Sequence, residues 1–256
     1  MRVRRHEVLD STSDEAFRLA QAGERGPIWV VATEQAGGRG RRGRAWASPP
    51  GNLYATLLLT DPGPRARLHE LGFVAGVALA DALAEVAPGA DVGLKWPNDG
   101  MIGPAKAAGI LVEATEFGGG GGGGATACAI GIGVNVASHP SGLAYPATCL
   151  AAHARAPRVE ATFGALATAL DARLAQWRGG EGFSAIRDAW LGRARGLGRP
   201  IRVETAKGAL EGAFAGLDAT GRLLVADGDG ESAVESGDVF IAADFVRARI
   251  SEDVGT

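Results

Sequence analysis

The sequence predicts an α+β protein: a mixed, largely antiparallel sheet with flanking helices, followed by a small C-terminal β-barrel. Three observations lead to this class. Up to about residue 195, apolar segments typical of strands alternate with segments of helical periodicity. After Gly198 only short strands and turns remain. The chain has 256 residues, which is enough for one full-sized core and a smaller domain. We therefore predict a first domain over residues 1–196 and a barrel domain over residues 197–256.

The first predicted element is a helix that begins near Thr12 and ends near Gly23. Thr12 and Glu15 have the spacing of a capping box, and residues 16–20 carry apolar side chains at helical spacing. Residues 28–33 are apolar apart from Thr33 and predict a buried strand. Residues 52–60 alternate and predict a second strand, and the prolines at 49 and 50 exclude a helix between the two strands.

Residues 68–86 have the periodicity of a long core helix, which Pro88-Gly89 follows. Residues 92–96 predict a strand, and the turn residues 98–100 predict a hairpin into a strand over 106–115. The seven consecutive glycines at 118–124 predict a flexible turn before a strand over 127–136. Two helices, over 159–178 and 182–195, complete the first domain.

The C-terminal part changes to short strands over 201–203, 210–216, 223–225 and 239–241. Turn residues at 218–221 and 227–230 separate them. This spacing predicts a small β-barrel of about fifty residues.

Composition limits the classes of function. Apolar residues make up 46% of the chain and charged residues 21%, as in ordinary soluble proteins. The formal net charge of −3 argues against an electrostatic nucleic-acid binder. Cys128 and Cys149 lack the spacing of metal ligands, so we interpret both as buried apolar residues. A signal-like segment and a membrane-spanning run are both missing, which predicts a cytoplasmic protein.

Residues 35–44 form a glycine-rich loop that carries four arginines. Gly38–Gly43 matches the dinucleotide pattern G-x-G-x-x-G, but that fingerprint needs a helix at its third glycine, whereas prolines and a strand follow here. A solvated basic turn is the plainer interpretation. The closely spaced glycines and the nearby Trp46 favour instead a mobile loop that closes over an anionic ligand.

Lys95 ends an apolar strand beside Leu94 and Trp96. A partly buried ammonium needs an anionic partner, so this lysine is a candidate anion-binding group. Lys106 repeats the arrangement before another apolar segment. For Asp99 a turn residue is an equal alternative, and residues 11–13 are more often helix caps than ligands. Residues 131–135 predict a strand with close backbone approach that ends in a side-chain amide.

Taken in order, these segments resemble the biotin protein ligase family. The matching stretches are residues 10–12, Gln35–Arg44 with Trp46, Lys95–Asp99, Lys106–Glu113, Gly131–Asn135 and, in the small domain, 218–223 and 236–239. The resemblance spans about residues 8–245. It implies a catalytic domain like that of class II aminoacyl-tRNA synthetases, shared with lipoate ligases, and a barrel like a Src-homology-3 domain.

The resemblance also implies a two-step reaction with ATP, Mg²⁺ and biotin. The biotin carboxylate attacks the α-phosphate of ATP to give biotinyl-5′-adenylate and pyrophosphate. The ε-amine of one lysine on a biotin carboxyl carrier protein then attacks the adenylate. Cations that neutralise the two repelling anions suit this chemistry, as does a loop that shields the mixed anhydride from water.

Carried over by position, the resemblance assigns roles to individual residues. Lys95 and Arg41 would be the catalytic cations. Biotin would be bound by Ser11, Thr12, Ser13, Gln35, Arg39, Gly40, Arg41, Lys95 and Gly109. The nucleotide would be bound by Arg41, Arg44, Trp46, Asn98, Lys106 and Asn135. Metal would enter only as Mg²⁺ with ATP.

Three positions depart from the family pattern. Ser13 stands where asparagine is usual, which puts its ureido contact in doubt, and Gly37 replaces a usual alanine, which predicts a more mobile loop. Cys149 stands where serine is usual. Because the first motif starts at Asp10, the chain resembles the monofunctional form without a DNA-binding domain. The resemblance leaves a homodimer open.

Two alternatives have different signatures. A lipoate ligase or octanoyl transferase of the same fold would need a long apolar tunnel, whereas residues 11–13 and Gln35 are polar. A nucleic-acid-binding module would use the arginine loop on a wider basic face and would bind in a strongly salt-dependent way. The acidic net charge argues against that module.

Overall fold

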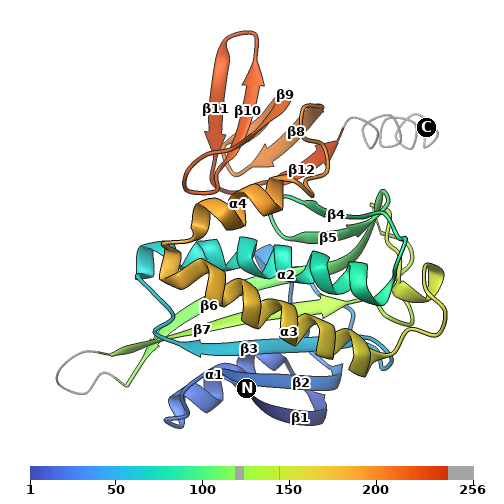
Figure 1. Cartoon of the computed structure of the whole chain (residues 1–256), viewed down its shortest axis with the longest axis vertical. Coiled ribbons are helices and arrows are strands. Elements are labelled where there is room, and N and C mark those ends of the chain that lie inside the picture. The colour runs from blue at the N-terminus through green and yellow to red at the C-terminus, as the bar shows by residue number, and fades with distance from the viewer. Residues whose placement is uncertain (119–123, 144, 242–256) are drawn as a thin grey trace.

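A computed structural model describes residues 1–118, 124–143 and 145–241. Its main feature is a seven-stranded sheet in the order β1-β2-β3-β7-β6-β5-β4 (Figure 1). Among the strand pairs described for this sheet, β1 with β2 is parallel and the others are antiparallel, so the predicted mixed, largely antiparallel sheet is confirmed. The strands are β1 (Arg2–Leu9), β2 (Ile28–Gln35), β3 (Leu53–Thr60), β4 (Val92–Lys95), β5 (Asp99–Ile102), β6 (Ala105–Phe117) and β7 (Ala125–Val134).

Helices cover both faces of this sheet. The long helices α2 (Leu71–Val86) and α3 (Val159–Trp177) pack on one face with α4 (Phe183–Leu191), while α1 (Thr12–Gln21) lies on the other (Figure 1). Two apolar clusters result: a large one around α2 and a small one in which Ala16 and Ala20 pack on Ile28 and Val30. Since the central strand β3 is buried between them, it is apolar almost throughout rather than alternating.

The prediction missed two strands of the main sheet. β1 has a charged, largely exposed sequence, and it is held by backbone pairing to the edge of β2 rather than by burial. β5 occupies residues for which a turn was predicted. The chain turns at residues 96–98 instead, and Asp99 already pairs with Lys95 in the ladder.

One predicted helix is too long. The segment 182–195 was predicted as helix, but α4 ends at Leu191. The following residues run beside β4, where the Leu94 amide donates to Arg193 O at 2.8 Å and the Arg195 amide to Leu94 O at 2.7 Å. Tertiary pairing therefore overrides the helical pattern.

The C-terminal strands form a five-stranded antiparallel sheet in the order β11-β10-β9-β8-β12. Its strands are β8 (Pro200–Thr205), β9 (Gly208–Leu217), β10 (Leu223–Asp227), β11 (Gly230–Val234) and β12 (Asp238–Ile241). β11 was not predicted, because its sequence is polar and exposed. Within the described residues, β11 and β12 form the two outer edges of this sheet.

Two further expectations concern the glycine run and membrane-spanning helices. Residues 119–123 of the glycine run, predicted as a flexible turn, lie outside the described residues. Among the described helices, none has the length and apolarity required to cross a membrane.

Candidate active site

A cavity of about 640 Å³ opens beside the main sheet, between the first turn of α1, the arginine loop and β12. It collects segments that are far apart in the chain. Its lining includes the predicted residues Ser11, Thr12, Ser13, Gln35, Arg39, Gly40, Arg41, Arg44, Trp46, Lys95, Asn98, Lys106 and Gly109. Of the predicted set only Asn135 lies outside it, on the wall of a neighbouring space of about 170 Å³.

Glycines remove side chains from the sheet where the cavity lies. Gly109 of β6 pairs with Gly133 of β7, and Gly131 lies two residues away on the same face. A Cβ atom at position 133 would come within 2.5 Å of Trp46 Nε1, and one at position 131 within 3.0 Å of Ser13 Oγ. The structure therefore confirms the close approach to the backbone that was predicted for residues 131–135. The indole of Trp46 occupies the space that a side chain at position 133 would need.

Buried polar side chains form a continuous hydrogen-bond chain along one wall. Thr56 Oγ1 donates to Thr12 Oγ1 at 2.8 Å, and Thr12 Oγ1 donates to Gln35 Oε1 at 3.0 Å. The Gln35 amide nitrogen donates to Ser48 Oγ at 3.0 Å, and Ser48 Oγ to Trp46 O at 2.9 Å. This chain fixes which way the Gln35 amide points, so the wall presents ordered donors and acceptors to a polar ligand.

Among the described residues, two cations that face the cavity have no carboxylate within ion-pair distance. Lys95, at the end of β4, is half-buried and makes no ion pair with any described residue. Arg41 donates to Ser236 Oγ and Gly237 O, both at 3.2 Å, and both acceptors are neutral. Burial is the main reason that the pKa of Arg41 is lowered from its usual value. Both groups are poised to bind an anion.

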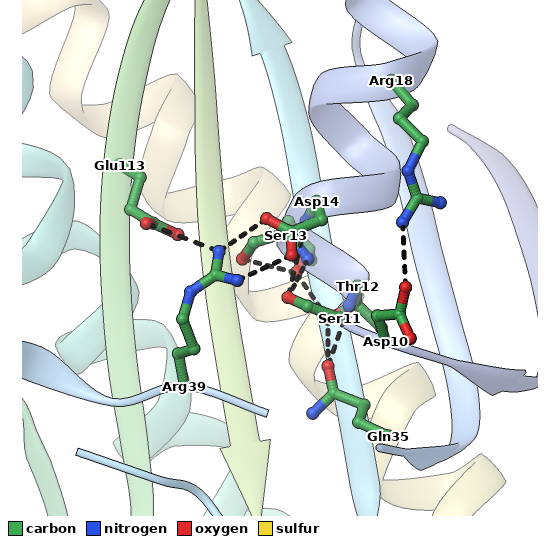
Figure 2. A network of polar contacts seen from close by, with 10 residues as sticks. Asp10, Ser11, Thr12, Ser13, Asp14, Arg18, Gln35, Arg39 and Glu113 are labelled. Atoms are coloured by element: carbon green, nitrogen blue, oxygen red, sulfur yellow. Dashed lines mark hydrogen bonds and ion pairs between the residues drawn. The ribbon is translucent and has the colours of Figure 1, made fainter. Parts of the chain in front are cut away.

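The other three loop arginines already have acidic partners. Arg39 donates to both oxygens of Asp14 at 2.6 Å (Figure 2). Arg42 and Arg44 contact the two oxygens of Asp238 at 3.1 and 2.9 Å. The loop is thus fastened to α1 at one end and to the C-terminal sheet at the other.

Lys106 lies beside a different part of the cavity. Its ammonium pairs with Asp99 at 2.6 Å and lies over the rings of Trp46 and Tyr145 at 5.4 and 5.5 Å from their centroids. Asp99 is therefore more than a turn residue, because its carboxylate neutralises the charge of Lys106. Aromatic faces beside a cation suit a flat heterocycle that carries phosphate.

Comparisons with known proteins agree with this arrangement. Residues 6–135 match the biotin/lipoate A/B protein ligase family, and residues 196–241 match the biotin protein ligase C-terminal domain. The chain is 39% identical to a biotin–[acetyl-CoA-carboxylase] ligase of Paracoccus denitrificans, covering 90% of this chain and 97% of the relative. It belongs to the biotin protein ligase family.

Two further relatives place this ligase in the family. It is 32% identical to the bifunctional ligase/repressor BirA of Bacillus subtilis, over 91% of this chain and 72% of that protein. Its fold matches the biotin protein ligase of Aquifex aeolicus solved with biotin and ATP, with a TM-score of 0.79, 25% identity and coverage of 94% and 98% of the two chains.

The side chains of Asn98 and Asn135 support the backbone of the ligase. Asn98 donates to Ile110 O at 2.6 Å, and Asn135 donates to Thr148 O at 3.0 Å. Arg44 likewise has Asp238 as its present partner. A direct contact of these three residues with nucleotide remains a prediction.

The predicted capping box is wrong in detail. Ser11, not Thr12, caps α1, because its Oγ accepts from the amides of Ser13 and Asp14. Thr12 is thereby free to bond Gln35 through both its amide and its hydroxyl. Ser13 Oγ lies 3.4 Å from Thr56 Oγ1, so the unusual serine joins the same polar wall.

Gly37 and Cys149, which also differ from the family pattern, each make a local contact. The amide of Gly37 donates to Asp10 O at 2.8 Å, which ties the start of the loop to the chain before α1. Cys149 is buried, with Sγ 3.6 Å from Ala137 O.

The sequence prediction missed two contributors to the site. Thr56 is fully buried in β3 between Ala55 and Leu57, and a hydroxyl between apolar neighbours was the available signal. Asp238 has no comparable signal, because its role depends on the packing of the C-terminal sheet against the loop.

Proposed function

We propose that this ligase activates biotin with ATP and transfers the biotinyl group to one lysine of a biotin carboxyl carrier protein. The observation that carries the proposal is a single cavity in which the polar wall of Thr12 and Gln35 and the unpaired cations Lys95 and Arg41 meet. A ureido ring needs both donors and acceptors, whereas a carboxylate and a phosphate need positive charge.

In the first step the biotin carboxylate oxygen attacks the α-phosphorus, and the bond to the bridging oxygen breaks to release pyrophosphate. We assign Lys95 to the carboxylate and the α-phosphate oxygens, and Arg41 to the charge that develops between them. Both are held in a partly buried site, where their attraction for anions exceeds that in water.

In the second step a neutral carrier lysine attacks the acyl carbon, the bond from that carbon to the phosphate oxygen breaks to release AMP, and the new amide nitrogen loses one proton to solvent. The arginine loop covers the cavity and shields the mixed anhydride from water. We assign Trp46 and Lys106 to the nucleotide, with Arg44, Asn98 and Asn135 as predicted supporting contacts. Ser11, Ser13, Gly40 and Gly109 complete the proposed biotin pocket.

We further propose that Mg²⁺ enters with the ATP phosphates. The described residues hold no cluster of three or more His, Cys, Asp and Glu side chains. Because Mg²⁺ commonly binds through substrate phosphates, waters and one or two carboxylates, a dedicated protein cage is not needed.

The setting of the reaction is also part of the proposal. We place the enzyme in the cytoplasm and assign it no DNA-binding role. We propose a catalytic domain over residues 1–196 and a small C-terminal domain over residues 197–256. A homodimer is left to measurement by sedimentation.

The test is to incubate the purified protein with biotin, ATP, Mg²⁺ and an apo-carrier domain. One biotinyl group on a single lysine is expected, together with biotin-dependent exchange of pyrophosphate into ATP. Parallel reactions with lipoate and octanoate test the alternative acyl ligase of the same fold. Exchange with either acid but not with biotin would overturn the proposal.

A further inference from the structure

The guanidinium of Arg39 already has a carboxylate partner within the protein. Its two terminal nitrogens donate to the two oxygens of Asp14, each at 2.6 Å, which is the paired geometry that favours arginine over lysine. This hydrogen bond is the first cause of the lowered pKa of Asp14 and of the raised pKa of Arg39. The pair therefore holds both groups in their charged forms.

A second carboxylate approaches the same guanidinium from the opposite side. Glu113 Oε1 lies 3.8 Å from Arg39, while Glu113 Oε2 is buried and has no hydrogen-bond partner in the described structure. Figure 2 shows Arg39 between Glu113 on β6 and Asp14 on α1. With two carboxylates near one guanidinium, the charge of Arg39 is already balanced locally, which disfavours binding of a third anion there.

The position of Arg39 makes this contact effective. Arg39 forms an isolated bridge with Ala45, the Gly40 amide donates to Arg44 O at 2.7 Å, and the Trp46 amide donates to Gly38 O at 2.9 Å. Arg39 and Ala45 are thus the stem of a hairpin whose tip carries Arg41. Fixing the stem sets the position of the tip.

We propose that Arg39 is a positioning residue that clamps the stem of the arginine loop to Asp14, rather than a ligand of biotin or ATP. This inference rests on the proposed function and reassigns one residue of its predicted site. Asp14 is the third residue of α1, directly after the residues at 11–13 that line the cavity. The clamp therefore joins the loop to the wall that receives the ligand.

The two interpretations predict opposite effects for the variant Asp14→Asn. If Arg39 bound the substrate, removing its competing carboxylate would leave biotin binding unchanged or strengthen it. If Arg39 is the clamp, the same variant loosens the loop. We then expect adenylate to dissociate about fivefold faster, as suits a partly exposed ion pair. Asp10→Asn is the matched control, because Asp10 lies near α1 but does not contact Arg39.

A charge reversal separates the clamp from a general loss of structure. Arg39→Ala and Asp14→Asn should have similar effects, and combining them should add little further loss. The exchange Arg39→Asp with Asp14→Arg should restore part of the adenylate retention that each single reversal loses. Full additivity of Arg39→Ala and Asp14→Asn would overturn the proposal.

Limited trypsin digestion tests the clamp without any substrate. Cleavage within residues 39–44 should be about fivefold faster in Asp14→Asn than in Asp10→Asn or the unaltered chain. Equal cleavage rates would contradict the clamp. Because this measurement needs no catalysis, it remains decisive even if the protein fails to activate biotin, and that failure would count only against the proposed function.

Discussion

Arg44 of the arginine loop contacts Asp238 of the C-terminal sheet, with Nη2 at 2.9 Å from Oδ1. The same carboxylate receives Arg42 at 3.1 Å, while the neighbouring Gly237 carbonyl and Ser236 hydroxyl accept from Arg41. Asp238, the first residue of β12, and the two residues before it thus hold the tip of the loop over the cavity. The C-terminal sheet is part of the site and not an appendage to it.

Asp238→Asn should therefore lower activity more than stability. The pair is partly exposed, so its loss should cost about 1 kcal/mol or less in unfolding free energy. Biotin-dependent pyrophosphate exchange should fall about fivefold, because the loop tip loses a charged anchor. Glu235→Gln is the control: it neutralises an exposed carboxylate nearby that makes no ion pair with a described residue. Equal activity of the two variants would refute this role for Asp238.

Lys95→Gln should abolish most adenylate formation. Removing one group that stabilises transition-state charge lowers turnover on the order of a hundredfold or more. The half-buried side chain has no ion pair within the described structure, so thermal unfolding should change little. Pyrophosphate exchange measures the first effect and calorimetry the second. A variant with near-normal exchange would remove Lys95 from the proposed catalytic pair.

Gly133→Ala should weaken nucleotide use. The added Cβ would come within 2.5 Å of Trp46 Nε1, so the indole must move from the wall beside Lys106. We expect the KM for ATP to rise about tenfold, with a smaller change for biotin, corresponding to about 1.4 kcal/mol.

Gly164→Ala provides the matched control for that substitution. Gly164 lies within α3, and an added Cβ there meets no atom of the described chain within 4 Å. It should raise stability by about 1 kcal/mol without altering the KM. An unchanged KM in Gly133→Ala would show that the position of Trp46 does not govern nucleotide binding.

Thr56→Val should reduce biotin affinity with little change in shape. It removes the hydroxyl that donates to Thr12 at 2.8 Å in a fully buried position. Loss of a buried hydrogen bond costs about 1 kcal/mol, or roughly fivefold in affinity, if the polar wall must reorient. Thr162→Val removes a comparable buried hydroxyl in α3, distant in sequence from the cavity lining, and should affect stability alone. Calorimetric titration with biotin separates the two.

Stability should decline in acid partly through Asp218. Burial opposes its ionisation, but hydrogen bonds from Arg222 and Thr220 outweigh burial and lower the pKa of Asp218 to about 2. A carboxyl with a depressed pKa stabilises the fold above its unfolded pKa, near 4, and that contribution is lost as the pH falls toward 2.

The variant Asp218→Ala tests this assignment. It should destabilise by about 2 kcal/mol at pH 7, and the difference from the unaltered chain should shrink between pH 4 and pH 2. Asp229→Ala, in an exposed turn of the same sheet, is the control. A difference that stays constant with pH would contradict the assignment.

Much of this molecule follows from local pattern. Apolar periodicity located the helices over 71–86 and 159–177, and it located β2, β3 and β7, because burial on a sheet or helix face leaves a signal in adjacent residues. The arginine loop and Lys95 were recognisable because each places positive charge within a short and unusual stretch of sequence. The exposed strand β1 was missed, since backbone pairing at a sheet edge needs no particular side chains.

The sequence by itself determined the fold class and most of the residues that gather at the cavity. Only the tertiary structure decided what each cation does there. The role of an arginine depends on which carboxylate it contacts, and these carboxylates are distant in the chain. Arg39 meets Asp14 and Arg44 meets Asp238, across 25 and 194 residues. Charge pairing acts through space over a few ångströms, so a linear pattern reveals the four arginines but not which one is left to bind substrate.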